Sequence, residues 1–204
     1  MPAVAASTVT TATEYEIDKI LNSRFIGWIS PCPDRERLLQ HLDARRGVYP
    51  TANHHCWAWI GRNDGVVRSS DDGEPRGSAG RRILDVLLGR ELREAVLVVT
   101  RYFGGTKLGV GGLGRAYAQA AREVVERAHV GPWVVRREVV VELPYEAMVA
   151  FDRLLERWAV AAGERNYGAA VRIKLAVDEA TWDARVHELA GVGARVVTST
   201  QTGR

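Results

Sequence analysis

The sequence has 204 residues, of which 46% are hydrophobic and 26% charged, with a formal net charge of +3 at pH 7. This length and apolar content suit one large or two small globular domains. The sequence has neither a long uncharged apolar run nor a signal-peptide pattern, so we expect a cytoplasmic protein that makes no contact with a membrane. Two cysteines, Cys32 and Cys56, fit neither a disulfide framework nor a zinc pattern and are expected to be free thiols.

Strand and helix patterns alternate along the chain and divide it into two parts. In the first part, apolar and β-branched runs bounded by turn residues indicate strands, whereas leucines at helical spacing indicate helices. Asp34 stands where it can cap the first helix. The expected elements are a strand over 23–30, a helix over 34–46, strands over 54–61 and 66–69 joined by a turn at Asn63-Asp64-Gly65, a helix over 78–89, a strand over 95–103 and a helix over 113–128.

The stretch His129-Val130-Gly131-Pro132 marks the boundary between the two parts. Beyond it the pattern is β-α-β-α-β, which with one added strand would make a ferredoxin-like sandwich. Its elements are expected over 133–144, 144–159, 167–177, 179–190 and 194–201. We therefore expect an α+β protein with a flexible tail at 1–13, a first domain at 14–131 and a second at 132–204.

The most unusual segment is RYFGGTKLGVGGLGR at 101–115, which combines six glycines and three basic residues with no acid. It closes a region, Arg76 to Arg115, that holds eight basic residues against three acidic ones. A glycine-rich loop that feeds a helix N-terminus can direct backbone N–H groups at an anion. Two interpretations stay open: a phosphate site that uses Arg101, Lys107 and Arg115, or glycines that only allow close packing.

The same segment matches G-x-G-x-x-G at 109–114, but a dinucleotide site is disfavoured. In that fold the first glycine follows the strand directly, whereas residues 101–108 intervene here, and no second βαβ unit with a ribose-binding acid follows. A P-loop does not fit because Thr106, not glycine, precedes Lys107. We therefore expect no cofactor.

Histidines and acids supply the candidates for catalysis or metal binding. His54 and His55 are adjacent on a predicted strand, so their rings face opposite sides and do not easily share one ion. Other histidines and cysteines lack the spacing of a zinc site, so no metal is expected. Asp71, Asp72 and Glu74 form the densest acidic group, which could hold Mg²⁺, act as acid and base, or only shape a turn. Ser78 stands where it can cap the helix that follows.

Five segments, in order, resemble the YigZ/Impact family. They are SRFIG at 23–27, HHCWAW at 54–59, SDDGEPRGSAG at 70–80, ILDVLLGREL at 83–92 and VVTRYFGGTKLGVGGLGRAYAQA at 98–120. The resemblance implies a first domain similar to domain 2 of ribosomal protein S5, and the C-terminal part looks like the ferredoxin-like domain of bacterial members. Two motifs depart from the family pattern: Ser78 and Arg82 replace an expected threonine and proline, and Gly114 replaces a branched apolar residue.

The resemblance also implies a set of cleft residues. By position they are Arg24, His54, His55, Asp71, Asp72, Glu74, Arg101, Tyr102, Gly104, Gly105, Lys107, Gly109, Gly111, Gly112 and Arg115. The acids and histidines of this set are the candidates for catalysis, and the others are the candidates for binding a ligand or phosphate. The resemblance further implies a C-terminal domain similar to the last domain of the translocation elongation factor. This analogue and that in ribosomal protein S5 both work on ribosomes or RNA, and eukaryotic relatives act in translational control by binding a partner.

The favoured function is that of a non-catalytic protein linked to translation. It would engage RNA, the ribosome or a translation-associated protein through the basic glycine-rich loop, with stacking on Tyr102, Phe103 or the Trp57 and Trp59 face. The alternative is an enzyme that acts on a phosphorylated small molecule or nucleotide through the Asp/Glu/His cluster. A third possibility is a module that binds only proteins, through an apolar patch. The sequence does not define an oligomeric state.

Overall fold

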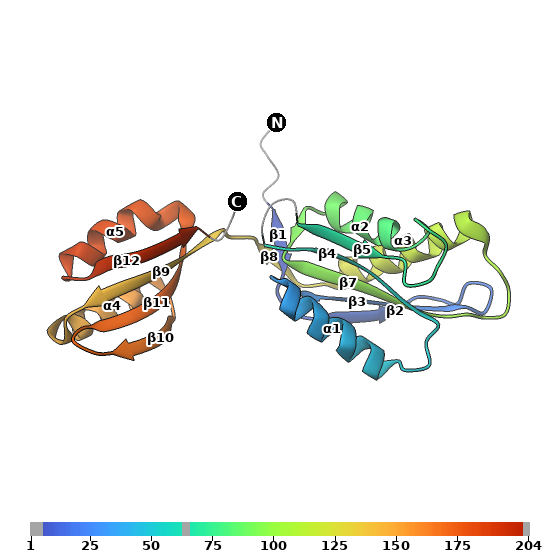
Figure 1. The fold of residues 1–204 in the computed structure, drawn as a ribbon. Helices are drawn as coiled ribbons and strands as arrows, with labels where there is room; N and C mark the ends of the chain where they lie inside the picture. The colour runs from blue at the N-terminus through green and yellow to red at the C-terminus, as the bar shows by residue number, and fades with distance from the viewer. Residues whose placement is uncertain (1–5, 63–65, 202–204) are drawn as a thin grey trace, which may run out of the picture. The chain divides into compact units, whose positions relative to one another are not determined.

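The computed structural model describes residues 6–62 and 66–201 (Figure 1). The predicted turn at 63–65 lies outside these residues. The chain forms two units, Met1–Trp133 and Val134–Arg204. The division therefore falls just after Trp133, close to the boundary expected between Gly131 and Pro132. The mixture of helices and strands confirms the α+β class, and no helix in the described ranges is long and apolar enough to cross a membrane.

The first unit is built on a five-stranded sheet in the order β2-β3-β7-β4-β5, in which all neighbours are antiparallel. Its strands are β2 (Thr13–Glu16), β3 (Arg24–Pro31), β4 (His54–Ile60), β5 (Val67–Ser70) and β7 (Ala95–Tyr102). The central strand β7 is buried from Ala95 to Arg101. This explains its continuous apolar sequence, because a strand covered on both faces has no solvent side to alternate toward.

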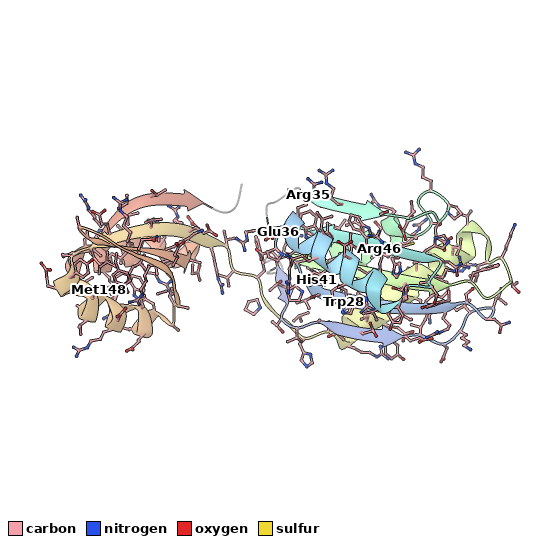
Figure 2. All side chains as sticks on the ribbon, turned by 60° about the horizontal axis from the view of Figure 1, so that its bottom comes forward. Trp28, Arg35, Glu36, His41, Arg46 and Met148 are labelled. Atoms are coloured by element: carbon pink, nitrogen blue, oxygen red, sulfur yellow. The ribbon has the colours of Figure 1, made fainter. Side chains whose placement is uncertain are left out.

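Helices cover both faces of this sheet (Figure 1). They are α1 (Arg35–Val48), α2 (Gly80–Gly89) and α3 (Gly109–Arg127). Leu97 and Val99 of β7 pack in the cluster that includes α2 and α3, whereas Val96 and Val98 pack in the cluster that includes α1. On the α1 side, the His41 ring lies edge-on against Trp28, with ring centroids 5.0 Å apart (Figure 2).

The start of α1 confirms the predicted cap. The Asp34 carboxylate accepts a hydrogen bond of 2.8 Å from the backbone N–H of Arg37. Such a bond satisfies one of the N–H groups that have no partner inside the helix.

The beginning of the chain differs from the expected tail. Residues Ser7–Val9 form β1, which pairs in parallel with β6 (Leu92–Arg93) and antiparallel with β8 (Val130–Pro132). Val9 is only 2% exposed. The Ala- and Thr-rich sequence has no local pattern that predicts a strand. The strand forms because it pairs with residues that lie far away in the sequence.

The second unit has the β-α-β-β-α-β order and the antiparallel sheet β10-β11-β9-β12 of a ferredoxin-like fold. Its elements are β9 (Arg136–Leu143), α4 (Met148–Trp158), β10 (Ala162–Tyr167), β11 (Val171–Asp178), α5 (Trp182–Gly191) and β12 (Arg195–Gln201), with short 3₁₀ turns at Tyr145–Ala147 and Glu179–Thr181. The strand predicted over 167–177 corresponds to β11, and the structure adds β10, which precedes it and pairs with it as a hairpin. Thus β10 is the added strand.

Candidate functional site

The glycine-rich stretch runs from the end of β7 into α3. The helix begins at Gly109, not at Leu113, so Gly109, Gly111 and Gly112 belong to its first turn. Because glycine is a poor helix former, the sequence predicted a helix start that is too late. Packing of the following turns, in which Leu113 is buried, outweighs that preference. The first turn has no acidic residue and no side-chain cap, so the N–H groups there receive no side-chain acceptor.

Part of the glycine content is explained by packing and turns. A Cβ atom on Gly104 would lie 2.1 Å from the backbone carbonyl carbon of Asn22, so no other residue fits there without a shift of the chain. The Gly104 N–H also donates a 3.1 Å hydrogen bond to Ser23 Oγ. Gly105 and Gly109 have φ angles of +88° and +68° and need the left-handed conformation. These three glycines shape the turn whether or not a ligand binds.

Arg101, one of the three proposed phosphate contacts, is buried and already paired. Its side chain is 5% exposed, and Nη1 lies 2.6 Å from Oε1 of Glu74, whose side chain is 4% exposed. Arg101 Nη2 donates to Ser23 Oγ at 3.3 Å. The Tyr117 hydroxyl donates to the same Glu74 oxygen at 2.8 Å. Arg101 therefore lies in the interior, which corrects its predicted position on a phosphate-binding surface.

Aromatic side chains enclose this ion pair. The Arg101 guanidinium lies 5.4 Å from the Phe25 ring centroid and 5.5 Å from that of Phe103. Phe25 in turn meets Tyr117 edge-on, with ring centroids 5.3 Å apart. Burial, the largest cause, raises the pKa of the Tyr117 hydroxyl above its usual range, and the nearby Cys56 and Glu74 raise it further. The hydroxyl is thus a fixed hydrogen-bond donor.

Asp71 caps helix α2. Its Oδ1 accepts hydrogen bonds from the backbone N–H groups of Ala79 (3.0 Å) and Gly80 (2.8 Å), and its Oδ2 accepts one from Gly77 (2.8 Å). Burial raises the pKa of the Asp71 carboxyl, but the three N–H donors and Arg76 together outweigh it, so the pKa lies below its usual value. The expected cap, Ser78, is therefore wrong, because Asp71 accepts the hydrogen bonds of the first N–H groups and the Ser78 hydroxyl has no partner in the described structure.

Asp72 holds the other side of the same loop. Its Oδ2 accepts a 2.6 Å hydrogen bond from the backbone N–H of His55, and its Oδ1 lies 3.8 Å from the Arg46 guanidinium, on α1 (Figure 2). All three candidate acids therefore have donors within the protein. No group of three or more His, Cys, Asp and Glu side chains in the described residues could hold a metal ion.

The two histidines engage different partners. His54 Nδ1 is 2.8 Å from the carbonyl oxygen of Asp72, and its Nε2 is 3.9 Å from Glu74 Oε1. His55 is 7% exposed, and its Nδ1 is 3.1 Å from Thr100 Oγ1. Burial lowers the pKa of the His55 imidazole, and Arg46 and Arg45 lower it further against the opposite effect of Asp72. The His55 ring is therefore held neutral.

The two cysteines are buried free thiols, as expected. Burial, with a smaller contribution from Asp34, raises the pKa of the Cys32 thiol to about 12. Burial also raises the pKa of the Cys56 thiol above its usual range. Neither thiol is activated as a nucleophile, because the reactive form is the thiolate.

The remaining binding candidates divide into closed and open side chains. The Arg24 guanidinium makes two 2.8 Å bonds to the Glu16 carboxylate and lies 5.1 Å from the Tyr102 ring centroid. Lys107 and Arg115 are exposed, and neither pairs with a carboxylate in the described part of the chain. Among the cationic residues predicted to bind a ligand, only Lys107 and Arg115 therefore lack a carboxylate partner within the described residues.

The structure adds residues that the sequence did not identify as a site. A hollow of about 400 Å³ between α2 and α3 is lined by Arg82, Arg115, Arg122 and Ser78, among others. Arg122 stands two helical turns after Arg115, a spacing that could have shown both on one face of α3. The Arg82 side chain crosses Gly114, where a Cβ atom would lie 3.3 Å from Arg82 Nε. The two departures from the family pattern therefore touch each other.

Comparisons with known proteins match both units. The Impact N-terminal domain matches residues 21–125. The IMPACT family member YvyE of Bacillus subtilis is 42% identical over 134 residues, which span 65% of this chain but only 59% of YvyE. An IMPACT family member of Haemophilus influenzae is 31% identical over 175 residues, which span 84% of this chain and 85% of that protein.

Two solved structures also match parts of this chain. A crystal structure of a hypothetical protein matches with a TM-score of 0.74 and 26% identity, and covers 94% of this chain and 96% of that chain. The structure of the two-domain translational regulator Yih1 matches with a TM-score of 0.34 and 23% identity, over 62% of this chain and 48% of that chain.

Proposed function

The chain belongs to the IMPACT family, and from this premise we propose that it is a binding protein linked to translation, which engages RNA, free or within the ribosome, through the basic surface at the start of α3. The link to translation rests on the family resemblance, in which eukaryotic relatives act in translational control. RNA is proposed because its phosphates are the anions that an unneutralised basic surface attracts.

The observation that carries this proposal is the pair of open cations, Lys107 and Arg115. Both are exposed at a helix end that has no acid in its first turn and no side-chain cap. Positive side chains and free N–H groups at one helix N-terminus attract the same phosphate oxygens. Phe103, which is 45% exposed, stands at the start of the same loop and offers a ring for stacking on a base. Trp59, 4% exposed, belongs to the core and offers none.

The alternative, an enzyme for a phosphorylated small molecule or nucleotide, finds less support. It needs carboxylates that are free to hold a metal or move protons. Asp71, Asp72 and Glu74 instead accept hydrogen bonds from the protein itself. These acids stabilise the 70–80 loop and the end of β7.

The test is binding of a labelled single-stranded RNA and a duplex RNA across a salt series. Wild type is expected to bind with an affinity that falls steeply with salt. A Lys107→Ala/Arg115→Ala variant should bind more weakly, with the slope of log K against log salt reduced by about 1.4 for single strands, because two phosphate contacts are lost.

The matched control is Arg35→Ala/Arg153→Ala, which removes the same charge from exposed positions on α1 and α4. This control should keep the wild-type slope. The proposal is wrong if wild type binds neither RNA at low salt, or if the two double variants bind alike.

A further inference from the structure

The hollow between α2 and α3 has an unusual lining of charge. Three arginines, Arg82 from α2 and Arg115 and Arg122 from α3, contribute to it, and no carboxylate does. Its volume of about 400 Å³ exceeds what a phosphate group needs and falls within the range of small-ligand sites. Arg115 and Arg122 have no ion-pair partner within the described residues. Arg82 has one carboxylate nearby, Asp85, at 4.0 Å.

Small residues on α3 leave room for arginine side chains beside the helix. Ala118 lies between the two α3 arginines and lines the same hollow. A Cβ atom on Gly114 would lie 3.3 Å from Arg82 Nε, and one on Gly111 would lie 3.7 Å from an Nη atom of Arg115. Like charges repel when they are held together, and a bound anion relieves this repulsion.

Ser78 gives an independent observation at the same place. It lines the hollow and is 1% exposed, yet its hydroxyl oxygen has no hydrogen-bond partner in the described structure. Asp71 occupies the N–H groups at the start of α2 that a serine in this position would otherwise cap. A buried hydroxyl without a partner is uncommon in a folded protein. A ligand oxygen that reaches this hydroxyl from the hollow would supply the missing partner.

From this geometry we propose that the hollow binds a phosphate monoester, carried by a nucleotide or by the 5′ end of an RNA. A phosphate monoester has a charge near −2 at neutral pH and three terminal oxygens, whereas the diester within an RNA chain has only one charge. Three guanidiniums and a hydroxyl match the monoester better in charge and in donors. For the RNA source, the inference rests on the proposed function and refines it to recognition of a chain end.

The experiment compares two RNAs of one sequence, one with a 5′-phosphate and one with a 5′-hydroxyl. Calorimetry with adenosine 5′-monophosphate and with inorganic phosphate runs in parallel. We expect the 5′-phosphorylated RNA to bind about tenfold more tightly, as one added charge-assisted contact allows. Arg82→Ala should abolish this preference and Ser78→Ala should reduce it.

Arg81→Ala is the matched control, because Arg81 is the exposed neighbour of Arg82, pairs with Asp85 and does not line the hollow. It should keep the tenfold preference. Equal affinity for the two RNAs, with no binding of the monophosphate, would overturn the inference and leave the proposed RNA binding standing. Monophosphate binding that Arg82→Ala removes, with no RNA binding, would support the site and refute the proposed function. No binding of any probe would refute both.

Discussion

Two regions of the first unit use arginine side chains in opposite ways. At the end of β7, Arg101 is enclosed between aromatic rings and shares Glu74 with the hydroxyl of Tyr117. Between α2 and α3, Arg115 and Arg122 line a hollow to which no described carboxylate contributes, although Asp85 lies 4.0 Å from Arg82 beside it. In the first region, which is closed, the charged groups are buried and paired with each other within the fold. The second is open, and its charges are available to a partner. The presence of an acid partner decides which role an arginine takes.

The largest expected effect is from Arg101→Ala in the closed region. The substitution leaves the Glu74 carboxylate buried without its cation, and breaking a buried pair in this way costs about 3–5 kcal/mol. We expect the free energy of unfolding, measured by urea denaturation, to fall by this amount. A loss below about 1 kcal/mol would show that water replaces the guanidinium and that the region is not closed.

A smaller effect is expected from Asp71→Ala. The change removes the acceptor of three backbone N–H groups at the start of α2, and losing a helix cap costs about 0.5–2 kcal/mol. The loss should appear in urea denaturation at pH 7. Because the pKa of Asp71 is lowered in the folded protein, its contribution is present above the pKa of the unfolded chain and disappears as the carboxyl is protonated. The difference between wild type and variant should therefore begin to shrink below about pH 4 and disappear only when the pH has passed below the lowered pKa of the folded carboxyl.

The pH dependence of stability tests the burial of His55. The folded protein disfavours the protonated imidazole, whereas the unfolded chain accepts a proton near pH 6.5. The contribution of the neutral His55 to the free energy of unfolding is therefore fully present above pH 6.5 and is lost as the pH drops below it. The decline between pH 7 and pH 5, followed by urea denaturation, should be shallower in His55→Gln. His129→Gln, at an exposed position, should keep the wild-type decline. Identical slopes in all three proteins would contradict the burial.

The smallest effect on stability is expected from Gly114→Ala in the open region. Alanine is a better helix former by about 1 kcal/mol, and the new Cβ meets a flexible Arg82 side chain at 3.3 Å. Stability should be unchanged or slightly raised, while Arg82 moves away from α3. The preference for a 5′-phosphate, measured as above, should fall. An unchanged preference would show that Arg82 does not take part in binding the phosphate in the hollow.

The sequence predicted those helices and strands whose pattern of apolar and polar residues matches the burial of the same residues in the fold. Strand β11 alternates buried and exposed residues along its length, and the spacing of its apolar residues showed this directly. Strand β10 is mostly polar and half exposed, so nothing in its sequence distinguished it from a loop. Strand β1 is short and depends on partners that lie far along the chain. In both strands, pairing outweighs composition.

The site was harder to predict because charge availability depends on distant contacts. Arg101 and Arg115 flank the same glycine-rich stretch and look equivalent in sequence. Glu74, which forms the buried ion pair with Arg101, comes 27 residues before it in the sequence. Arg82 and Arg122 come together only through the packing of α2 on α3. The departures at positions 82 and 114 were visible in the sequence, but their contact required the structure.

We propose that the open arginines serve binding and that the closed arginine serves the fold. The most direct measurement takes Arg115→Ala and determines its free energy of unfolding and its affinity for 5′-phosphorylated RNA at low salt. We predict an unfolding free energy within about 0.5 kcal/mol of wild type, as for surface substitutions in general, together with a clear loss of affinity. A loss of stability comparable to that of Arg101→Ala, or an unchanged affinity, would contradict the claim.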